Sequence, residues 1–376
     1  MNRVKVSIVR CFEYEIDKVY DAVKHSLNLI GGLEPLKKIG RRALLKPNLI
    51  SGKEPEYAVT THPVFFEAVV KILKENDFEV AVGESPALEN LFSVAKKCGL
   101  LEIIEKYQLP FIEFDDPEKT SNPEGKIVKN FNISKKIFDY DFLVSLPKLK
   151  THVQMFYTGA MKNIFGCISG LQKAQFHLRF PERNEFAEMI VDLNLLLKPR
   201  LGIVDGIVAM EGHGPQNGNP KNLGVVASSF DLAALDLVCS EIIGYDYNDI
   251  PIIRNALLRK TFFISSQEEI EVMGERFIDK NFQKIKIPQE IHFLHDKIPR
   301  FLLRFVNNLT VPRPFFNHKK CIRCGRCVDI CAAEALKFVH SKSKKRVSID
   351  YKKCIKCYCC DEICPVDAIK LKIMPF

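Results

Sequence analysis

Eight of the thirteen cysteines in this 376-residue chain form two copies of one spacing near its C-terminal end. The first copy is Cys321, Cys324, Cys327 and Cys331, and the second is Cys354, Cys357, Cys360 and Cys364. Both copies read C-x2-C-x2-C-x3-C, the spacing with which thiolates hold cubane iron–sulfur clusters. A segment with this spacing folds around its metal, so the two copies constrain the fold of this region more than any other feature does.

The spacing also indicates which cysteines share a cluster. Three closely spaced cysteines reach three irons of a cubane, while the fourth cysteine of each run lies at the start of the next helix and ligates the other cluster. We therefore predict two [4Fe–4S] clusters with two crosswise ligand sets: Cys321, Cys324, Cys327 with Cys364, and Cys354, Cys357, Cys360 with Cys331. Zinc is the alternative, but structural zinc sites use four ligands around one ion, which tandem triple cysteines fit poorly. Cys359 matches no ligand position.

The cysteine runs are parts of an internal repeat. A short helical stretch is expected after each run, at 332–336 and at 366–369, and a hairpin is expected from 336–340 and 346–350. Segment 315–376 resembles bacterial-type ferredoxins with two [4Fe–4S] clusters. That resemblance implies a small α+β domain that transfers electrons. The sequence departs from that family at Ala332, where a proline is usual, whereas the second half keeps Pro365.

Most of the net charge of +9 lies in this segment, because fourteen Lys and Arg face six Asp and Glu between Phe316 and Phe376, a balance of +8. Clusters held by four thiolates are anionic, so nearby cations favour their reduced form. The cations beside ligand positions are Lys319, Lys320, Arg323, Arg326, Lys352, Lys353 and Lys356. This charge predicts an acidic electron-transfer protein as a partner, and no nucleic acid is expected.

Cys11, Cys98, Cys167 and Cys239 are scattered in apolar surroundings and are expected to be reduced core residues. The N-terminal residues lack the basic–apolar–small order of a signal peptide. No apolar run has the length of a transmembrane segment. These features predict a cytoplasmic protein.

Residues 1–285 alternate short apolar runs with helical patterns, which predicts an α/β domain with a mainly parallel sheet. The expected strands are Val4–Val9, Ala43–Leu49, Glu79–Gly83, Phe142–Leu146, Gly202–Asp205 and Gly224–Ser228. The expected helices are Ile16–Leu29, Pro63–Lys74, Glu185–Leu197 and Leu232–Ile243, the last with Asp231 as its N-cap. Segment 286–314 is expected to be a linker, with a short amphipathic helix at 298–306 that packs between domains or lies on a membrane surface.

Polar residues follow several of these strands, at the edge where ligands bind in parallel sheets. As ligands of an anionic substrate or cofactor we predict Lys46, Asn48, Lys148, Lys162 and Asn163, and as catalytic residues His152, Lys150 and His213. For any one of them a structural role is the commoner reading, and the prediction rests on the set. There is no G-x-G-x-x-G, no Walker A loop and no H-E-x-x-H.

The same motifs resemble the domain of unknown function family DUF362 over about residues 5–245. The resemblance is carried by Lys46-Pro47-Asn48, Lys148 to His152, Lys162 to Gly166, Asp205-Gly206 and Asp231 to Asp236. Members of that family often carry a ferredoxin-like segment. The resemblance implies an association with iron–sulfur clusters, but it brings no established substrate and no catalytic residue.

Two functions remain open from the sequence. In the first, the clusters deliver electrons to an anionic molecule in the large domain, where His152, His177 or His213 supplies protons. A second metal held by Asp205, Glu211, His152 and His213 would fit that chemistry. In the second, the chain is a non-catalytic electron-carrying subunit or an assembly factor, and its large domain docks a partner protein.

Overall fold

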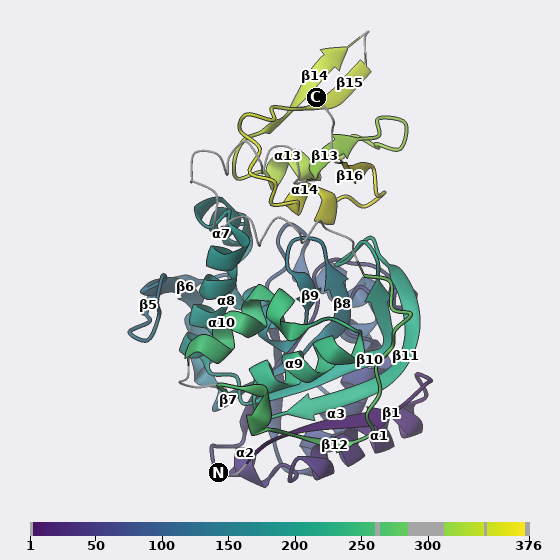
Figure 1. Cartoon of the computed structure of the whole chain (residues 1–376), viewed down its shortest axis with the longest axis vertical. Helices are drawn as coiled ribbons and strands as arrows, with labels where there is room; N and C mark the ends of the chain where they lie inside the picture. The colour runs from purple at the N-terminus through teal and green to yellow at the C-terminus, as the bar shows by residue number, and fades with distance from the viewer. Residues whose placement is uncertain (1–2, 260–263, 285–311, 342–343, 373–376) are drawn as a thin grey trace. The chain divides into compact units, whose positions relative to one another are not determined.

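The computed structural model describes residues 3–259, 264–284, 312–341 and 344–372, which divide into two units. The large unit comprises Met1–Lys173 and Glu182–Gln283, and the small unit comprises Ala174–Pro181 and Lys284–Phe376. Figure 1 labels the helices and strands of both units. The expected helix at 298–306 and most of the predicted linker lie outside the described residues.

The large unit is built on a ten-stranded sheet with the strand order β12-β1-β11-β10-β7-β2-β3-β4, while β8 pairs with β10 and β9. Its strands are β1 (Val4–Arg10), β2 (Arg42–Pro47), β3 (Glu79–Glu84), β4 (Phe111–Glu113), β7 (Phe142–Leu146), β8 (Lys148–His152), β9 (Phe156–Thr158), β10 (Leu201–Glu211), β11 (Asn219–Ser229) and β12 (Ile270–Gly274). Within this ten-stranded sheet, as far as the structure describes it, only the pairs of β11 with β1 and β10, and of β8 with β9, are antiparallel. The predicted mainly parallel sheet is therefore confirmed.

Helices surround this sheet. They are α1 (Ile16–Leu29), α2 (Glu34–Lys37), α3 (Pro63–Glu75), α4 (Leu91–Lys97), α5 (Leu100–Lys106), α6 (Ala160–Asn163), α8 (Arg183–Leu197), α9 (Leu232–Ile242) and α10 (Pro251–Arg259), with 3-10 turns at Pro55–Tyr57, Lys135–Asp139, Ile164–Cys167, Tyr247–Asp249 and Gln267–Glu269. The hairpin of β5 (Pro117–Ser121) and β6 (Asn130–Ser134) stands apart from the main sheet. Helix α7 spans Gln172–Arg179.

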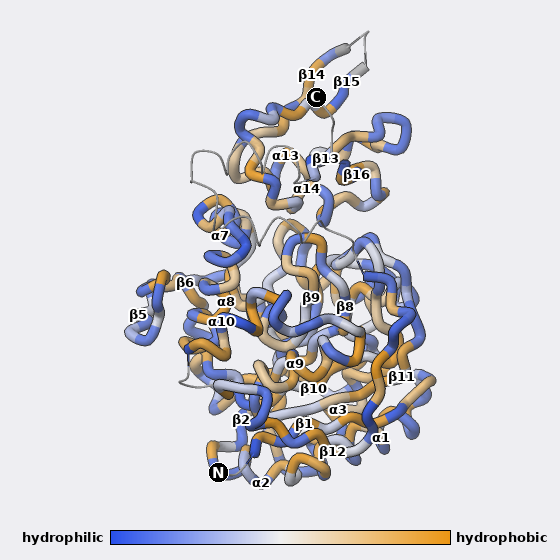
Figure 2. The backbone as a smooth tube through the Cα atoms, in the orientation of Figure 1, coloured by the Kyte–Doolittle hydropathy of each residue, from blue (hydrophilic) through white to orange (hydrophobic). Residues whose placement is uncertain are grey.

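Alternation along the strands explains why helices cover both faces. Ala43 and Leu45 of β2 join one hydrophobic cluster with α1 and α3, and Leu44 between them points to the other face. On that other face, Gly202 of β10 lies against Leu235 of α9. Figure 2 shows the hydrophobic residues concentrated along the interior strands and helices of the large unit.

The small unit has a twofold repeat in its strand pairing. Strand β13 (Arg313–Phe316) pairs with β16 (Ile369–Lys372), and β14 (Leu336–Ser341) pairs with β15 (Lys344–Ile349), both antiparallel. The strand before the first cysteine run therefore pairs with the strand after the second run. The expected hairpin is present, and the antiparallel strands agree with the predicted α+β class.

The expected helices after the cysteine runs are wrong. Helix α13 (Arg326–Asp329) and helix α14 (Cys359–Glu362) lie inside the runs, and the fourth cysteine of each run follows its helix. Left-handed backbone explains both boundaries. Gly325 and Tyr358 have positive φ where the helices begin, and Glu334 and Asp367 have positive φ just before the strands.

None of the helices that the structure describes is both long enough and apolar enough to cross a membrane.

Candidate functional site

The cysteines of the first predicted ligand set meet around one cavity of the small unit. Cys321, Cys324, Cys327 and Cys364 all line it, together with Phe316, Ile322, Val347, Ile369 and others. Burial, together with the neighbouring thiols of Cys324, Cys364 and Cys321, raises the pKa of the Cys327 thiol to about 12. The structure thus places Cys364, from the second run, beside the three close cysteines of the first.

The second predicted set is also assembled from both runs. Burial raises the pKa of Cys354, and the nearby thiols of Cys357 and Cys331 add to that increase. The thiol of Cys360 is likewise surrounded, since burial and the thiols of Cys357 and Cys354 raise its pKa. Cys331 therefore lies with the cysteines of the other run.

Backbone amides support the fourth cysteine of each run. The Ala335 N–H donates to Cys331 Sγ over 3.3 Å, and the Ala368 N–H donates to Cys364 Sγ over 3.2 Å. Such bonds stabilise thiolates that ligate iron. These residues therefore fit two [4Fe–4S] clusters.

The described residues do not form a site for a single metal ion. Among residues 3–259, 264–284, 312–341 and 344–372, no three His, Cys, Asp or Glu side chains are set to bind one ion. Zinc requires four ligands on one ion, whereas a cubane spreads its four thiolates over four irons. The same finding corrects the expectation of a second metal, because Asp205, Glu211, His152 and His213 do not form such a group.

In the large unit, Lys148 of β8 and Asp205 of β10 form a fully buried ion pair of 2.9 Å. Tyr14, just after β1, donates its hydroxyl to Asp205 Oδ1 over 2.7 Å and accepts a bond of 2.5 Å from Lys148 Nζ. The backbone N–H of His62 donates to Asp205 Oδ2 over 2.9 Å. The imidazole ring of His62 stacks on the ring of Tyr14, with 3.4 Å between the ring centroids. Three other segments, those of Lys148, Tyr14 and His62, thus converge on the Asp205 carboxylate at the strand ends.

Burial sets the protonation of this network. It lowers the pKa of Lys148, an effect that the Asp205 charge opposes. It also lowers the pKa of His62 to about 4, so this imidazole is neutral near pH 7. The pKa of Tyr14 is well above its ordinary value because burial and Asp205 both disfavour the phenolate. At neutral pH the network therefore places the Lys148–Asp205 pair beside a neutral tyrosine and a neutral histidine.

The neutral state of His62 predicts a specific loss of stability in acid. A histidine whose pKa falls on folding contributes stability above about pH 6.5, and this contribution is lost as the pH falls toward about 4. We expect a loss of roughly 1–3 kcal/mol, reduced by partial solvent exposure. His62→Asn keeps an N-cap acceptor for the Val64 N–H but cannot titrate. Urea unfolding at several pH values should show that the free energy of unfolding falls less for H62N than for the wild type as the pH is lowered toward about 4. If both proteins lose the same free energy over this pH range, the assignment to His62 is contradicted.

A second buried pair lies at the ends of β2 and β3. Lys46 Nζ contacts Glu84 Oε2 at 2.5 Å, and both side chains are almost fully buried. Gly166 lies against this pair, where a Cβ would collide with the carboxylate of Glu84 and the ammonium group of Lys46. Lys173 is nearby, donates to the Ser85 and Ile168 carbonyls, and has its pKa lowered by burial to about 8.

A chain of hydrogen bonds connects further predicted residues. Lys150 Nζ donates to Asn48 Oδ1 and to the Val59 carbonyl, each over 2.7 Å. Asn48 Nδ2 donates to Asn163 Oδ1 over 3.2 Å, and Asn163 Nδ2 donates to the Lys46 carbonyl over 2.8 Å. The structure therefore brings Lys46, Asn48, Lys150 and Asn163 together.

The other predicted residues have separate surroundings. His152 is buried at the end of β8, where its Nδ1 accepts from the N–H groups of Gln154 and Met155. His213 is half-buried in the turn between β10 and β11, and Lys162 of α6 lies over the ring of Phe165. Tyr14 and His62 were not predicted from the sequence, although Tyr14 follows a strand and His62 directly precedes the helix that begins at Pro63.

Comparison with known proteins identifies the large unit. A family model described as domain of unknown function (DUF362) matches residues 43–241, more than half of the chain. The chain belongs to the DUF362 family. A 4Fe-4S dicluster domain matches residues 315–371, so this DUF362 member is an iron–sulfur protein.

One curated relative is the thylakoid-associated protein sll1697 of Synechocystis sp., which is 35% identical over 247 residues, or 65% of this chain and 76% of that protein. Among solved structures, the lactate racemase apoprotein from Thermoanaerobacterium thermosaccharolyticum matches with a TM-score of 0.40 and 17% identity. That match covers 62% of this chain and 55% of the racemase chain, and it is too distant to inform fold or activity here.

Asp236, from one motif that carried the resemblance to DUF362, contacts the start of the helix that carries Lys162 and Asn163 of another motif. Asp236 of α9 accepts hydrogen bonds from the Ala160 and Met161 N–H groups, 2.6 and 2.9 Å long, at the start of α6. Gly159 permits this approach, because a Cβ there would collide with Asp236 and Tyr157. Burial raises the pKa of Asp236 to about 7, and the two N–H bonds oppose that increase. In this DUF362 protein, Asp236 therefore positions α6.

Proposed function

We propose that this chain binds two [4Fe–4S] clusters and delivers their electrons, one at a time, to an anionic substrate or cofactor at the strand ends of the large unit. The observation that carries the electron-transfer part is the meeting of Cys364 with Cys321, Cys324 and Cys327 around one cavity. When bound, each cluster accepts and releases a single electron. The chain's own residues hold the thiolates and surround them with cations.

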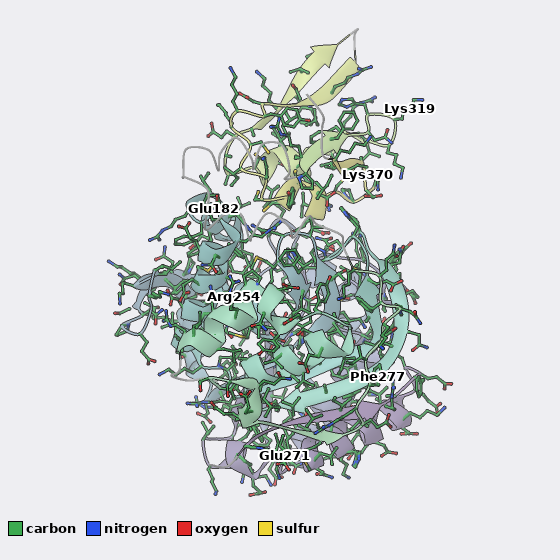
Figure 3. All side chains as sticks on the ribbon, viewed as in Figure 1. Glu182, Arg254, Glu271, Phe277, Lys319 and Lys370 are labelled. Carbon is green, nitrogen blue, oxygen red and sulfur yellow. The ribbon has the colours of Figure 1, made fainter. Side chains whose placement is uncertain are left out.

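The surface of the small unit supports an acidic electron-transfer partner. Lys319 and Lys370 are labelled on the outside of this unit in Figure 3, and both side chains are exposed to solvent. Lys320, next to the ligand Cys321, is also exposed. Clustered positive charge accelerates association with an acidic protein and favours the reduced clusters.

Buried charge at the strand ends supports an anionic ligand in the large unit. Lys46 and Lys173 lie around the single carboxylate of Glu84, which leaves one positive charge without a carboxylate of its own in this set. Polar groups at the carboxyl ends of parallel strands are where ligands bind in such sheets. The Lys148–Asp205 pair, by contrast, is internally balanced.

The alternative is a non-catalytic electron carrier or assembly factor whose large unit docks a protein. A groove beside the edge strand β12 favours it. Partly or largely exposed apolar side chains line part of this groove: Ile270, Val272, Phe277 and Ile278. Exposed apolar surface of this kind marks sites of protein association.

Anaerobic purification of the full chain tests both parts. The electron-transfer part requires about eight irons and eight acid-labile sulfides per chain, with two cluster signals on reduction. For the large unit, the reduced protein is mixed with small reducible molecules that carry a carboxylate or phosphate group, and its reoxidation by them is followed by absorbance. Lys173→Met should slow reoxidation at least tenfold, while Lys18→Met, in an exposed ion pair with Glu13, should not. Equal rates for both variants would favour the docking alternative.

A further inference from the structure

Strand β12 lies at one end of the ten-stranded sheet, beside β1 (Figure 1). It pairs with β1 in parallel, in a register that runs from Val4 with Ile270 to Ile8 with Gly274. On its other side, no strand pairs with β12 in the part of the chain that the structure describes. A sheet edge of this kind presents backbone N–H and C=O groups with which a further strand can pair.

The two faces of β12 look toward different helices. The hydroxyl groups of Ser7 in β1 and Ser26 in α1 are 2.6 Å apart, so Ser7 points toward α1. Met273 is the register partner of Ser7 and shares this face. Because successive side chains of a strand point to opposite faces, Ile270 and Val272 lie on the other face of the sheet.

A groove with a volume of about 600 Å³ lies on that second face. Ile270 and Val272 line it from the strand, and Leu237, Val238 and Ile242 line it from α9. The side chains of Ile270 and Val272 are only partly buried, so no described residue covers them fully. A strand added to β12 would direct every second side chain toward this groove.

Two cations also line the groove. Arg276 and Lys280 belong to the segment that follows β12, and both are exposed. Neither forms an ion pair with any residue that the structure describes. The one carboxylate in the described lining is Glu241, which accepts a hydrogen bond of 2.8 Å from the side-chain amide of Gln267. The described lining of the groove is therefore positively charged.

The acidic neighbours of these two cations in the sequence are held by other residues. Glu275 accepts a hydrogen bond of 2.8 Å from Arg10 Nε, and Asp279 lies 3.0 Å from Lys221 Nζ. The backbone N–H of Asp279 donates to the Ile242 carbonyl over 2.7 Å, which fixes the segment against the end of α9. The two groove cations are thus held in place and keep their charge for a bound carboxylate.

We propose that the β12 edge binds an extended acidic segment of another protein as an added strand, with apolar side chains in the groove and carboxylates at Arg276 and Lys280. In this binding mode, main-chain hydrogen bonds provide affinity and the side-chain groove provides specificity. Complementary charge fixes the register and accelerates association. The site does not require the proposed electron transfer, since none of its residues belongs to the cysteine runs or to the strand-end lysines.

The probe for this site is a capped, fluorescein-labelled heptapeptide, Glu-Thr-Val-Thr-Val-Thr-Glu, titrated with the anaerobically purified full chain. Fluorescence anisotropy should show that Arg276→Glu combined with Lys280→Glu weakens binding by about tenfold or more. The same variant should bind Lys-Thr-Val-Thr-Val-Thr-Lys more tightly than the wild type does. Lys119→Glu combined with Lys129→Glu, two exposed positions of the β5–β6 hairpin, changes the net charge equally and should leave both affinities unchanged.

Two N-methylated probes test the backbone pairing. Methyl groups on the odd or on the even residues block opposite edges of an extended peptide, so only one of the two probes should lose affinity, by roughly tenfold or more. The parent probe should also slow amide hydrogen exchange in β12. Cluster content is measured on the same preparations, so a failure of electron transfer is seen separately.

Three results would each overturn the proposal: no binding of the parent probe, unchanged affinity in the Arg276→Glu/Lys280→Glu variant, or equal affinities of the two methylated probes. Sedimentation of the chain alone covers the remaining occupant. Self-association that the probe reverses would assign the β12 edge to a second copy of this chain, and the acidic partner would then be wrong.

Discussion

Replacing Cys364 by alanine should remove the same cluster as replacing Cys321, although Cys364 belongs to the other run. The reason is that Cys364 lines the cavity of Cys321, Cys324 and Cys327. We expect C364A and C321A each to lose about four of eight irons and to leave one common EPR spectrum after reduction. Iron analysis and EPR of anaerobically reconstituted protein measure both.

The two corresponding variants of the second ligand set provide the matched control. C331A and C354A should leave a second common spectrum, different from the first, because Cys331 lies with the second run. If ligation instead occurred within each half, the spectrum of C364A would match that of C354A. This pairing of spectra does not depend on knowing in advance which signal belongs to which cluster.

Asp205→Ala should be the most destabilising change in the strand-end network. It leaves the buried ammonium of Lys148 without its carboxylate and removes the acceptor of the Tyr14 hydroxyl and the His62 N–H. Removing one partner of a buried ion pair costs roughly 3–5 kcal/mol. Urea unfolding of the full chain, followed by tyrosine circular dichroism of the large unit, measures the change.

Two further variants separate charge from packing. Lys148→Met combined with Asp205→Leu removes both charges and should recover much of the stability lost in D205A. Lys18→Met breaks an exposed pair with Glu13 and should cost less than about 1 kcal/mol. A D205A protein within about 1 kcal/mol of the wild type would show that the buried pair is not needed for folding.

The sequence predicted those strands and helices whose pattern of residue types is set within the segment itself. Phe142–Leu146 is β7 and Ile16–Leu29 is α1 with the same bounds, and Asp231 caps α9 through bonds to the Ala233 and Ala234 N–H groups. In these segments, residue type and periodicity determine the element directly. The four scattered cysteines are also free and buried, as expected.

Elements that depend on distant partners were missed. Lys148–His152 was expected to follow a strand, yet it is β8 itself, because β10 and β9 pair with it and bury its lysines. Strand β12 exists through its pairing with β1, more than 250 residues earlier in the chain. Tyr14 and His62 were missed for the same reason, because Asp205, to which both are hydrogen-bonded, is remote from them in the sequence.

The pairing of β13 with β16 joins the two ends of the small unit, and this constrains when the unit can assemble during synthesis. Strand β13 finds its partner only when β16 has been synthesised, and the first ligand set lacks a member until Cys364 leaves the ribosome. Iron delivered during translation would meet only three of those thiolates. With the proposed ligation, insertion of the first cluster therefore follows translation of both runs.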